Sequence, residues 1–107
     1  AEARHLADEA LAEAEATSNA KAAVSTMRTL AKIERARIVE AVPDPGQRDF
    51  ALAIAHAEAA VARSRETDNV QVMREALTDL GDLLMEAGQV QRGAAAYREA
   101  LQVVERG

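Results

Sequence analysis

The two histidines are the first residues to consider for metal binding or acid–base catalysis, and they lie far apart in the sequence. His5 has three carboxylates at helical spacing from it, on Glu2, Asp8 and Glu9. Such a set could hold a divalent metal ion, but on an acidic, alanine-rich helix it is far more often a solvated face. His56 lies beside an apolar stripe and is expected at the edge of a packed face. We therefore expect no metal site at either histidine.

Covalent catalysis is not indicated by the other residue types. The 107 residues include no cysteine, and no serine has an evident histidine partner. The segment 88–93 contains two glycines but follows a helical pattern and not a strand, so it does not match a phosphate-binding loop. The sequence thus predicts a protein that is not an enzyme and that needs no cofactor.

A basic stripe is the clearest charged feature in the first half of the chain. Lys21, Arg28, Lys32 and Arg35 are spaced by seven, four and three residues, which places them on one side of a helix. A nucleic acid could bind such a stripe, but the net charge of −5 and the scarcity of aromatic residues argue against it. We expect the stripe to face acidic residues of the preceding segment, such as Glu9, or to be solvated. Nucleic-acid binding is kept as an alternative.

Apolar periodicity predicts five helices that could position these side chains. Their ranges are roughly 3–16, 20–42, 46–65, 69–87 and 89–106. The breaks between them contain residues that end or cap helices, because proline cannot extend a helix and glycine readily takes the left-handed conformation. Capping boxes are predicted at Asp44 with Gln47 and at Asp68 with Gln71.

The last two predicted helices have the most regular apolar stripes, since residues three or four apart share one helix face. The first stripe is Val70, Met73, Leu77, Leu80 and Leu84, and the second is Val90, Ala94, Tyr97, Leu101 and Val104. Two antiparallel helices with these stripes would close on each other. They would also leave apolar surface for a neighbour, and Ala95, Ala96 and Val103 are candidates for that contact.

This pattern resembles the tetratricopeptide repeat (TPR) family. That family has a large residue early in its first helix, a Leu-Gly pair, another large residue and a glycine near the turn. Its second helix then has a small residue, an aromatic and an alanine. The chain has Leu77, Leu80-Gly81, Leu84, Gly88, Gly93, Tyr97 and Ala100 at these places. It departs from the family in having Leu77 instead of tryptophan and Glu105 instead of the late proline.

The resemblance implies an all-α domain over residues 1–107, made of antiparallel hairpins stacked as a short right-handed TPR-like array. Within it, 1–45 would be a divergent hairpin, 46–68 the second half of a repeat and 69–107 the best-matching repeat. The chain starts with Ala1 and not with methionine, so we expect it to be a piece of a larger protein. Such an array would act as a protein–protein interaction or scaffold module.

In the TPR family the first helix of each repeat lines a concave groove in which the ligand lies. The residues that this implies for partner binding are Glu75, Thr78, Asp79, Asp82, Met85 and Glu86. Four carboxylates with one methionine would favour a basic or amphipathic peptide or helix. The alternative function is homo-oligomerisation, with a homodimer formed through the uncovered flank of the last helix.

Composition points to a setting for this module. The chain is rich in alanine, and arginine far outnumbers lysine, which is typical of GC-rich bacterial genes and resembles the repeat regions of bacterial regulatory proteins. No apolar run approaches the roughly 18–20 residues that a membrane span needs. No signal peptide is visible, so we expect a cytoplasmic bacterial protein without a membrane partner.

Overall fold

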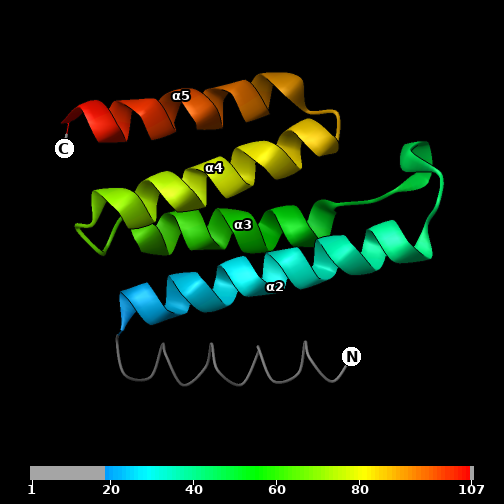
Figure 1. The fold of residues 1–107 in the computed structure, drawn as a ribbon, viewed down its shortest axis with the longest axis horizontal. Coiled ribbons are helices and arrows are strands. Elements are labelled where there is room, and N and C mark those ends of the chain that lie inside the picture. Colours follow the sequence, from blue (N-terminus) through cyan, green and yellow to red (C-terminus); the bar gives the residue numbers. More distant parts are fainter. Residues whose placement is uncertain (1–18, 107) are drawn as a thin grey trace.

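The computed structural model describes residues 19–106, which form four α-helices and a short 3-10 helix. Their bounds are Ala20–Ala41 for α2, Pro45–Gln47 for η1, Ala51–Ser64 for α3, Val70–Glu86 for α4 and Val90–Arg106 for α5. Each helix packs antiparallel to the next, and this part of the chain contains no sheet (Figure 1). The all-α prediction is confirmed for these residues, whereas the predicted helix 3–16, with His5 and Glu9, lies outside them. In residues 19–106 no helix combines the length and apolar character needed to cross a membrane.

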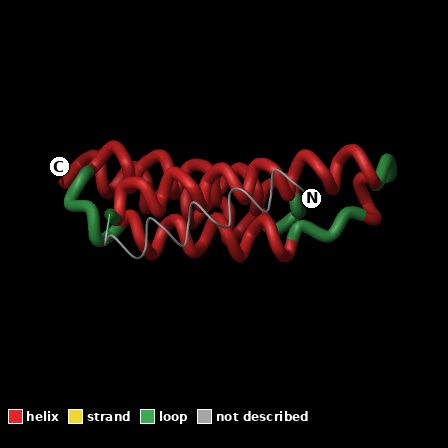
Figure 2. Tube along the Cα trace, turned by 90° about the horizontal axis from the view of Figure 1, so that it is seen from below, coloured by secondary structure: helices red, strands yellow, loops and turns green. Residues whose placement is uncertain are grey.

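Alternate helices are joined by ion pairs, which shows how the layers are arranged. Because each helix reverses direction, α2 runs parallel to α4, and α3 runs parallel to α5 (Figure 1). On the α3 and α5 side, Arg92 pairs with Glu58 and Arg65 pairs with Glu99, each at 2.8 Å. Both of these pairs join residues 34 positions apart. The Cα extents of 40 × 33 × 14 Å describe a flat slab, and the view from below shows its helices in two layers (Figure 2).

The core consists of two apolar clusters along this slab, both rich in alanine. One cluster brings together Val24 and Met27 of α2 with Val61 of α3, Leu77 of α4 and Val103 of α5. The second lies toward the other end and includes Phe50, Ile54 and Leu84. Small side chains between the larger ones let the helices approach closely.

The close contact between α4 and α5 depends on two glycines. A Cβ atom added to Gly81 would lie 2.5 Å from Cε1 of Tyr97, and one added to Gly93 would lie 2.9 Å from Cγ of Met85 and 3.2 Å from the Gly81 carbonyl oxygen. The turn between the helices has Gly88 at φ +82°, in the left-handed region expected there. The left-handed glycine expected between the two helices is thus confirmed at Gly88.

The inward face of α5 differs from the predicted stripe. Its buried residues are Gly93, Ala96, Ala100 and Val103. Val90, Leu101 and Val104 are 58%, 65% and 47% exposed. The close approach of α4 places Gly93 and the Tyr97 ring at the contact, whereas Val90, Leu101 and Val104 point outward. Ala96 and Val103 are therefore core residues. The uncovered flank of α5 is instead formed by Val90, Leu101 and Val104 of the predicted stripe.

The start of α3 was predicted too early. Asp44 does cap a helix with Pro45 at its first position, accepting a hydrogen bond from the Gly46 N–H at 3.0 Å, but that helix is only η1. The chain is then extended at Arg48, whose Nε donates to the Val42 carbonyl oxygen at 2.7 Å. This side chain binds the carbonyl at the end of α2. The connection continues to Phe50, which is the N-cap of α3.

The cap of α4 was predicted one residue too early. Asn69, and not Asp68, is the N-cap, and its side chain accepts a hydrogen bond from the Val72 N–H at 3.1 Å. Asp68 instead takes the left-handed conformation, with φ +53°. Both residue types cap helices well, so their order in the sequence does not decide which one does. Gln71 donates to Glu75 and does not close a capping box on Asp68.

Candidate binding groove

A groove of about 440 Å³ lies between α2 and α4. Its floor is apolar and consists mainly of small residues from all three neighbouring helices: Ala31, Ala57, Ala60, Ala76 and Leu83. We call this cavity the α2–α4 groove. Because alanine ends at Cβ, the floor is low, and the space above it is bounded by the longer charged side chains of the two walls.

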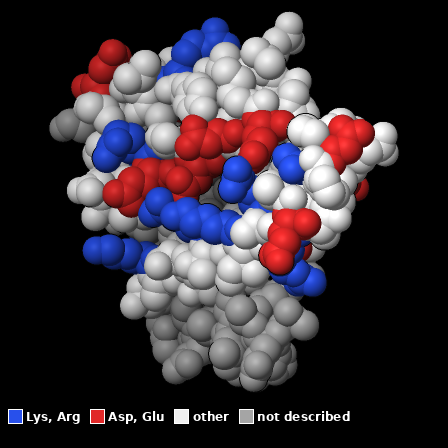
Figure 3. Space-filling view, turned by 45° about the vertical axis from the view of Figure 1, so that its right-hand side comes forward, with Lys and Arg blue, Asp and Glu red and all other residues white. Residues whose placement is uncertain are grey.

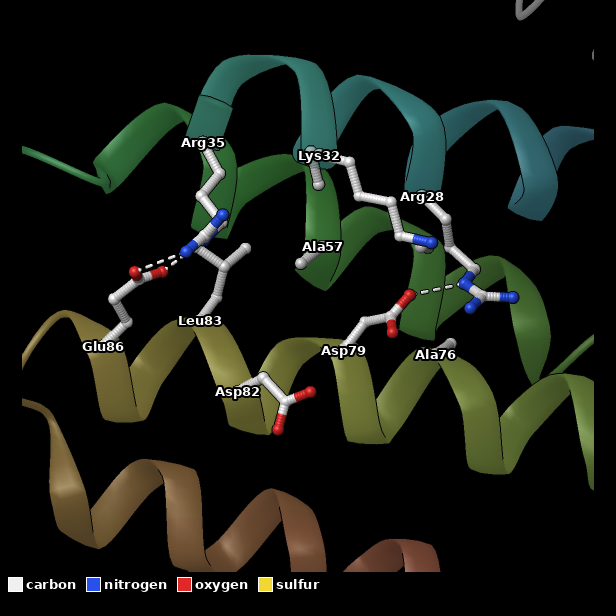
Figure 4. A pocket seen from close by; sticks show the side chains of 11 residues that line it. Arg28, Lys32, Arg35, Ala57, Ala76, Asp79, Asp82, Leu83 and Glu86 are labelled. Carbon is white, nitrogen blue, oxygen red and sulfur yellow. Dashed lines mark hydrogen bonds and ion pairs between the residues drawn. The ribbon is translucent and has the colours of Figure 1, made fainter. Parts of the chain in front are cut away.

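The two walls have opposite charge. α2 contributes Arg28, Lys32 and Arg35, and α4 contributes Asp79, Asp82 and Glu86 (Figure 4). The space-filling view shows acidic and basic side chains gathered next to each other on one face of the molecule, around a hollow (Figure 3). The groove is therefore of mixed charge and not uniformly acidic.

Two arginines of α2 bridge the groove to carboxylates of α4. Arg28 pairs with Asp79 through Nε at 2.5 Å and with Glu75 through Nη1 at 2.8 Å. Arg35 binds Glu86 with both Nε and Nη2, at 2.5 and 2.8 Å, in the bidentate geometry that suits a guanidinium. The arginines are seven residues apart, as are Asp79 and Glu86, so the two bridges repeat after two helical turns.

These contacts shift the pKa values of the groups that make them. A hydrogen bond from Arg35 lowers the pKa of Glu86, and a hydrogen bond from Gln71, reinforced by Arg28, lowers the pKa of Glu75. Burial opposes the charged form of Arg28, but its contacts with Asp79 and Glu75 outweigh this, and the pKa of Arg28 is raised. Glu75, Glu86 and Arg28 are thus held in their charged forms at neutral pH.

Lys32 and Asp82 are the charged lining residues that make no ion pair with another described residue. Both are exposed. Asp82 accepts a hydrogen bond from the Tyr97 hydroxyl on Oδ1 at 2.5 Å, which leaves its second oxygen available. The groove therefore offers one cation from α2 and one carboxylate from α4 to a ligand.

The structure brings together part of the site that the TPR resemblance implied. Asp79, Asp82 and Glu86 line the α2–α4 groove, and Glu75 joins it through Arg28. The other two residues lie elsewhere: Thr78 lines a separate groove toward α5, and the Met85 side chain packs against Gly93.

The basic wall of the α2–α4 groove, which α2 provides, was not predicted from the sequence. The basic stripe was expected to face the preceding segment or solvent, yet Arg28 and Arg35 face α4. A signal for this was present, because the seven-residue spacing of the two arginines matches that of Asp79 and Glu86. Glu9, the partner expected for the stripe, lies outside the described residues.

No cluster of three or more His, Cys, Asp or Glu residues that could hold a metal ion occurs within residues 19–106. His56 is partly buried on α3. Comparison of the chain with protein-family models, with curated proteins and with solved structures found no match.

Proposed function

We propose that this chain is a TPR-like protein-interaction module that binds an amphipathic peptide segment of a partner protein in the α2–α4 groove. The observation that carries the proposal is the open groove with an alanine floor between walls of opposite charge. Ligand sites in proteins are commonly concave and mostly apolar, with a few charged groups that orient the ligand. The antiparallel helix order and the contact of Gly81 with Tyr97 support the TPR-like assignment.

The unpaired charges indicate the chemistry of the peptide. A Lys or Arg of the ligand would pair with Asp82, and an Asp or Glu would pair with Lys32. Small apolar side chains between them would lie over the floor near Ala31 and Leu83, its least buried residues. Three of the four carboxylates on α4 already hold an arginine, so a ligand carrying both charges fits better than a purely basic one.

Binding of nucleic acid through the basic stripe has less support. Arg28 and Arg35 are engaged by carboxylates, and a phosphate approaching them would meet Asp79 and Glu86. Electrostatic repulsion and the loss of two ion pairs would both oppose that approach. A peptide with charges of both signs avoids this cost because it uses Lys32 and Asp82.

Affinity capture from a nuclease-treated bacterial lysate, followed by mass spectrometry, would test the proposal. The baits are the original chain, the Lys32→Glu variant, the Asp82→Lys variant and a Glu40→Lys control. Glu40 is exposed on the same helix as Lys32 but outside the groove. We expect a partner that the original chain and the control retain and that both groove variants lose. Equal capture by all four baits would contradict the proposal.

A further inference from the structure

A second groove lies between α4 and α5 and is separate from the α2–α4 groove. Its volume is about 300 Å³, and it is lined by Arg74, Thr78, Tyr97, Ala100, Leu101 and Val104. We call it the α4–α5 groove. Leu101 has the largest exposed fraction among the large apolar side chains described, and Val104 is also about half exposed. Burying these two side chains would remove apolar surface from water, which favours association.

The chain itself shows how an equivalent surface is covered. At an offset of 40 residues, Leu101 and Val104 of α5 correspond to Val61 and Ser64 of α3. Val61 and Ser64 are only 5% and 0% exposed. α4 packs on α3, and its Leu77 lies in the same core cluster as Val61. The positions on α5 differ in that no described helix packs over them.

The charged residues of α2 and α4 indicate what chemistry a covering helix needs. On α2, Arg28 is met by Glu75 and Asp79, two carboxylates that lie one turn apart on the covering helix. On α4, Arg74 is the only charged residue that lines the α4–α5 groove. It is exposed and makes no ion pair with any other described residue. A helix that covers this groove therefore needs a carboxylate opposite Arg74.

We propose that the α4–α5 groove docks an acidic amphipathic helix from a partner protein. Leucine and alanine side chains of that helix would pack on Leu101 and Val104, and a carboxylate would pair with Arg74. The sequence of α4 meets these requirements, because it carries Leu77 together with Glu75 and Asp79. This surface is distinct from the α2–α4 groove, so the inference does not depend on the proposed function.

A labelled peptide with the sequence of residues 69–87 is the probe that tests this proposal, with binding to the full chain measured by fluorescence polarisation. We expect saturable binding that Leu101→Glu weakens at least about tenfold, because a buried apolar contact is replaced by a charge. The matched control is Leu52→Glu, since Leu52 is an exposed leucine on α3 that lines neither groove. This variant should bind as the original chain does.

Charge reversal adds a second test. Arg74→Glu should weaken binding, and a peptide carrying Glu75→Arg and Asp79→Arg should restore it. Absence of saturable binding up to about 1 mM peptide would overturn the proposal. Equal effects of the Leu101 and Leu52 variants would overturn it too, because the peptide would then be replacing the chain's own α4 or binding elsewhere.

The mass of the chain in solution separates a partner protein from a second copy. We expect a monomer by light scattering for both the original chain and Leu101→Glu. A dimer that Leu101→Glu dissociates would overturn the proposal, since a second copy would then occupy the α4–α5 groove. Circular dichroism should show the same helix content for all variants, because the substituted side chains are exposed.

Discussion

At the scale of single residues, the pKa of the Tyr97 phenol depends on its contact with Asp82, which lines the α2–α4 groove. Tyr97 is the only tyrosine, and the chain has no tryptophan, so phenolate absorbance follows this one side chain. Its hydrogen bond to Asp82, with a smaller contribution from burial, raises the pKa of Tyr97 above its usual value of 10.0. Replacing Asp82 with asparagine removes the negative charge, and we expect spectrophotometric titration to show a lower pKa for the Tyr97 phenol.

The pH dependence of stability follows from the direction of this shift. A group whose pKa is raised by folding contributes stability below its ordinary pKa and loses it as the pH rises through the folded value. The contribution of the Tyr97–Asp82 contact should thus be complete at neutral pH and disappear above about pH 10. A Glu40→Gln variant is the control. Identical titration of the original chain and Asp82→Asn would show that the hydrogen bond is not formed.

The ion pairs between α2 and α4 should be stronger than the ion pairs between α3 and α5. Arg28 and Asp79 are only 24% and 26% exposed, whereas Arg65 and Glu99 are 57% and 38% exposed. Screening by water weakens exposed pairs. In double-mutant cycles with alanine, measured by urea unfolding, we expect a coupling free energy of roughly 1 kcal/mol for Arg28–Asp79 and below about 0.5 kcal/mol for Arg65–Glu99. Equal coupling energies would contradict this difference in burial.

Residue types were easier to predict from the sequence than their partners. The carboxylates of α4 and the cations of α2 were both identified, but their pairing depends on the placement of two helices that do not follow each other in the chain. The misplaced cap at Asp68 has a local cause, because Asp68 and Asn69 can each accept the capping hydrogen bond. Choosing between them requires the backbone conformation, which is left-handed at Asp68.

At the scale of elements, the contact between α4 and α5 determines whether an alanine at position 81 stabilises or destabilises the fold. Gly81→Ala should destabilise the chain by about 1–2 kcal/mol, because the new Cβ would lie 2.5 Å from the Tyr97 ring. In a Tyr97→Ala background the ring is absent, and the same substitution should instead stabilise by up to about 1 kcal/mol, since alanine favours helix over glycine. Thermal unfolding of the four chains would measure both effects. Destabilisation of equal size in the two backgrounds would contradict a contact between Gly81 and Tyr97.

Helix ends were predictable where the sequence has one strong signal. α4 and α5 lie within about one residue of their predicted ranges because Gly88 ends the first of them. The predicted start of α3 was wrong because Pro45 begins a short helix that does not continue, and because Arg48 binds the end of α2. The inward face of α5 could not be read from apolar periodicity, since its small residues pack more closely than its large ones.

At the scale of the whole molecule, α4 lies between other described helices and contacts α2, α3 and α5. We expect its backbone amides to exchange most slowly with solvent, since opening α4 breaks both core clusters. The connection 42–50 should exchange fastest among the described residues, since only η1 interrupts it. Hydrogen-exchange mass spectrometry measures both. Slower exchange in α2 than in α4 would contradict this order.

The order of the helices in space was partly predictable. Short connections imply antiparallel neighbours, and this holds for the four described helices. The side-by-side placement of α2 and α4 had weaker support, because the chain between them includes a whole helix and two turns. The matching seven-residue spacing of charges is consistent with that placement. The spacing alone does not identify the paired residues, because that requires the positions of both helices.

The most direct test of the account is site-specific photo-crosslinking from the α2–α4 groove. A photoreactive amino acid replaces Lys32 in one chain and Glu40 in another, and both are irradiated in the same lysate before mass spectrometry. We expect a partner protein crosslinked from position 32 and not from position 40, through a peptide containing both acidic and basic residues. Crosslinks of equal yield from both positions, or none from position 32, would contradict peptide binding in this groove.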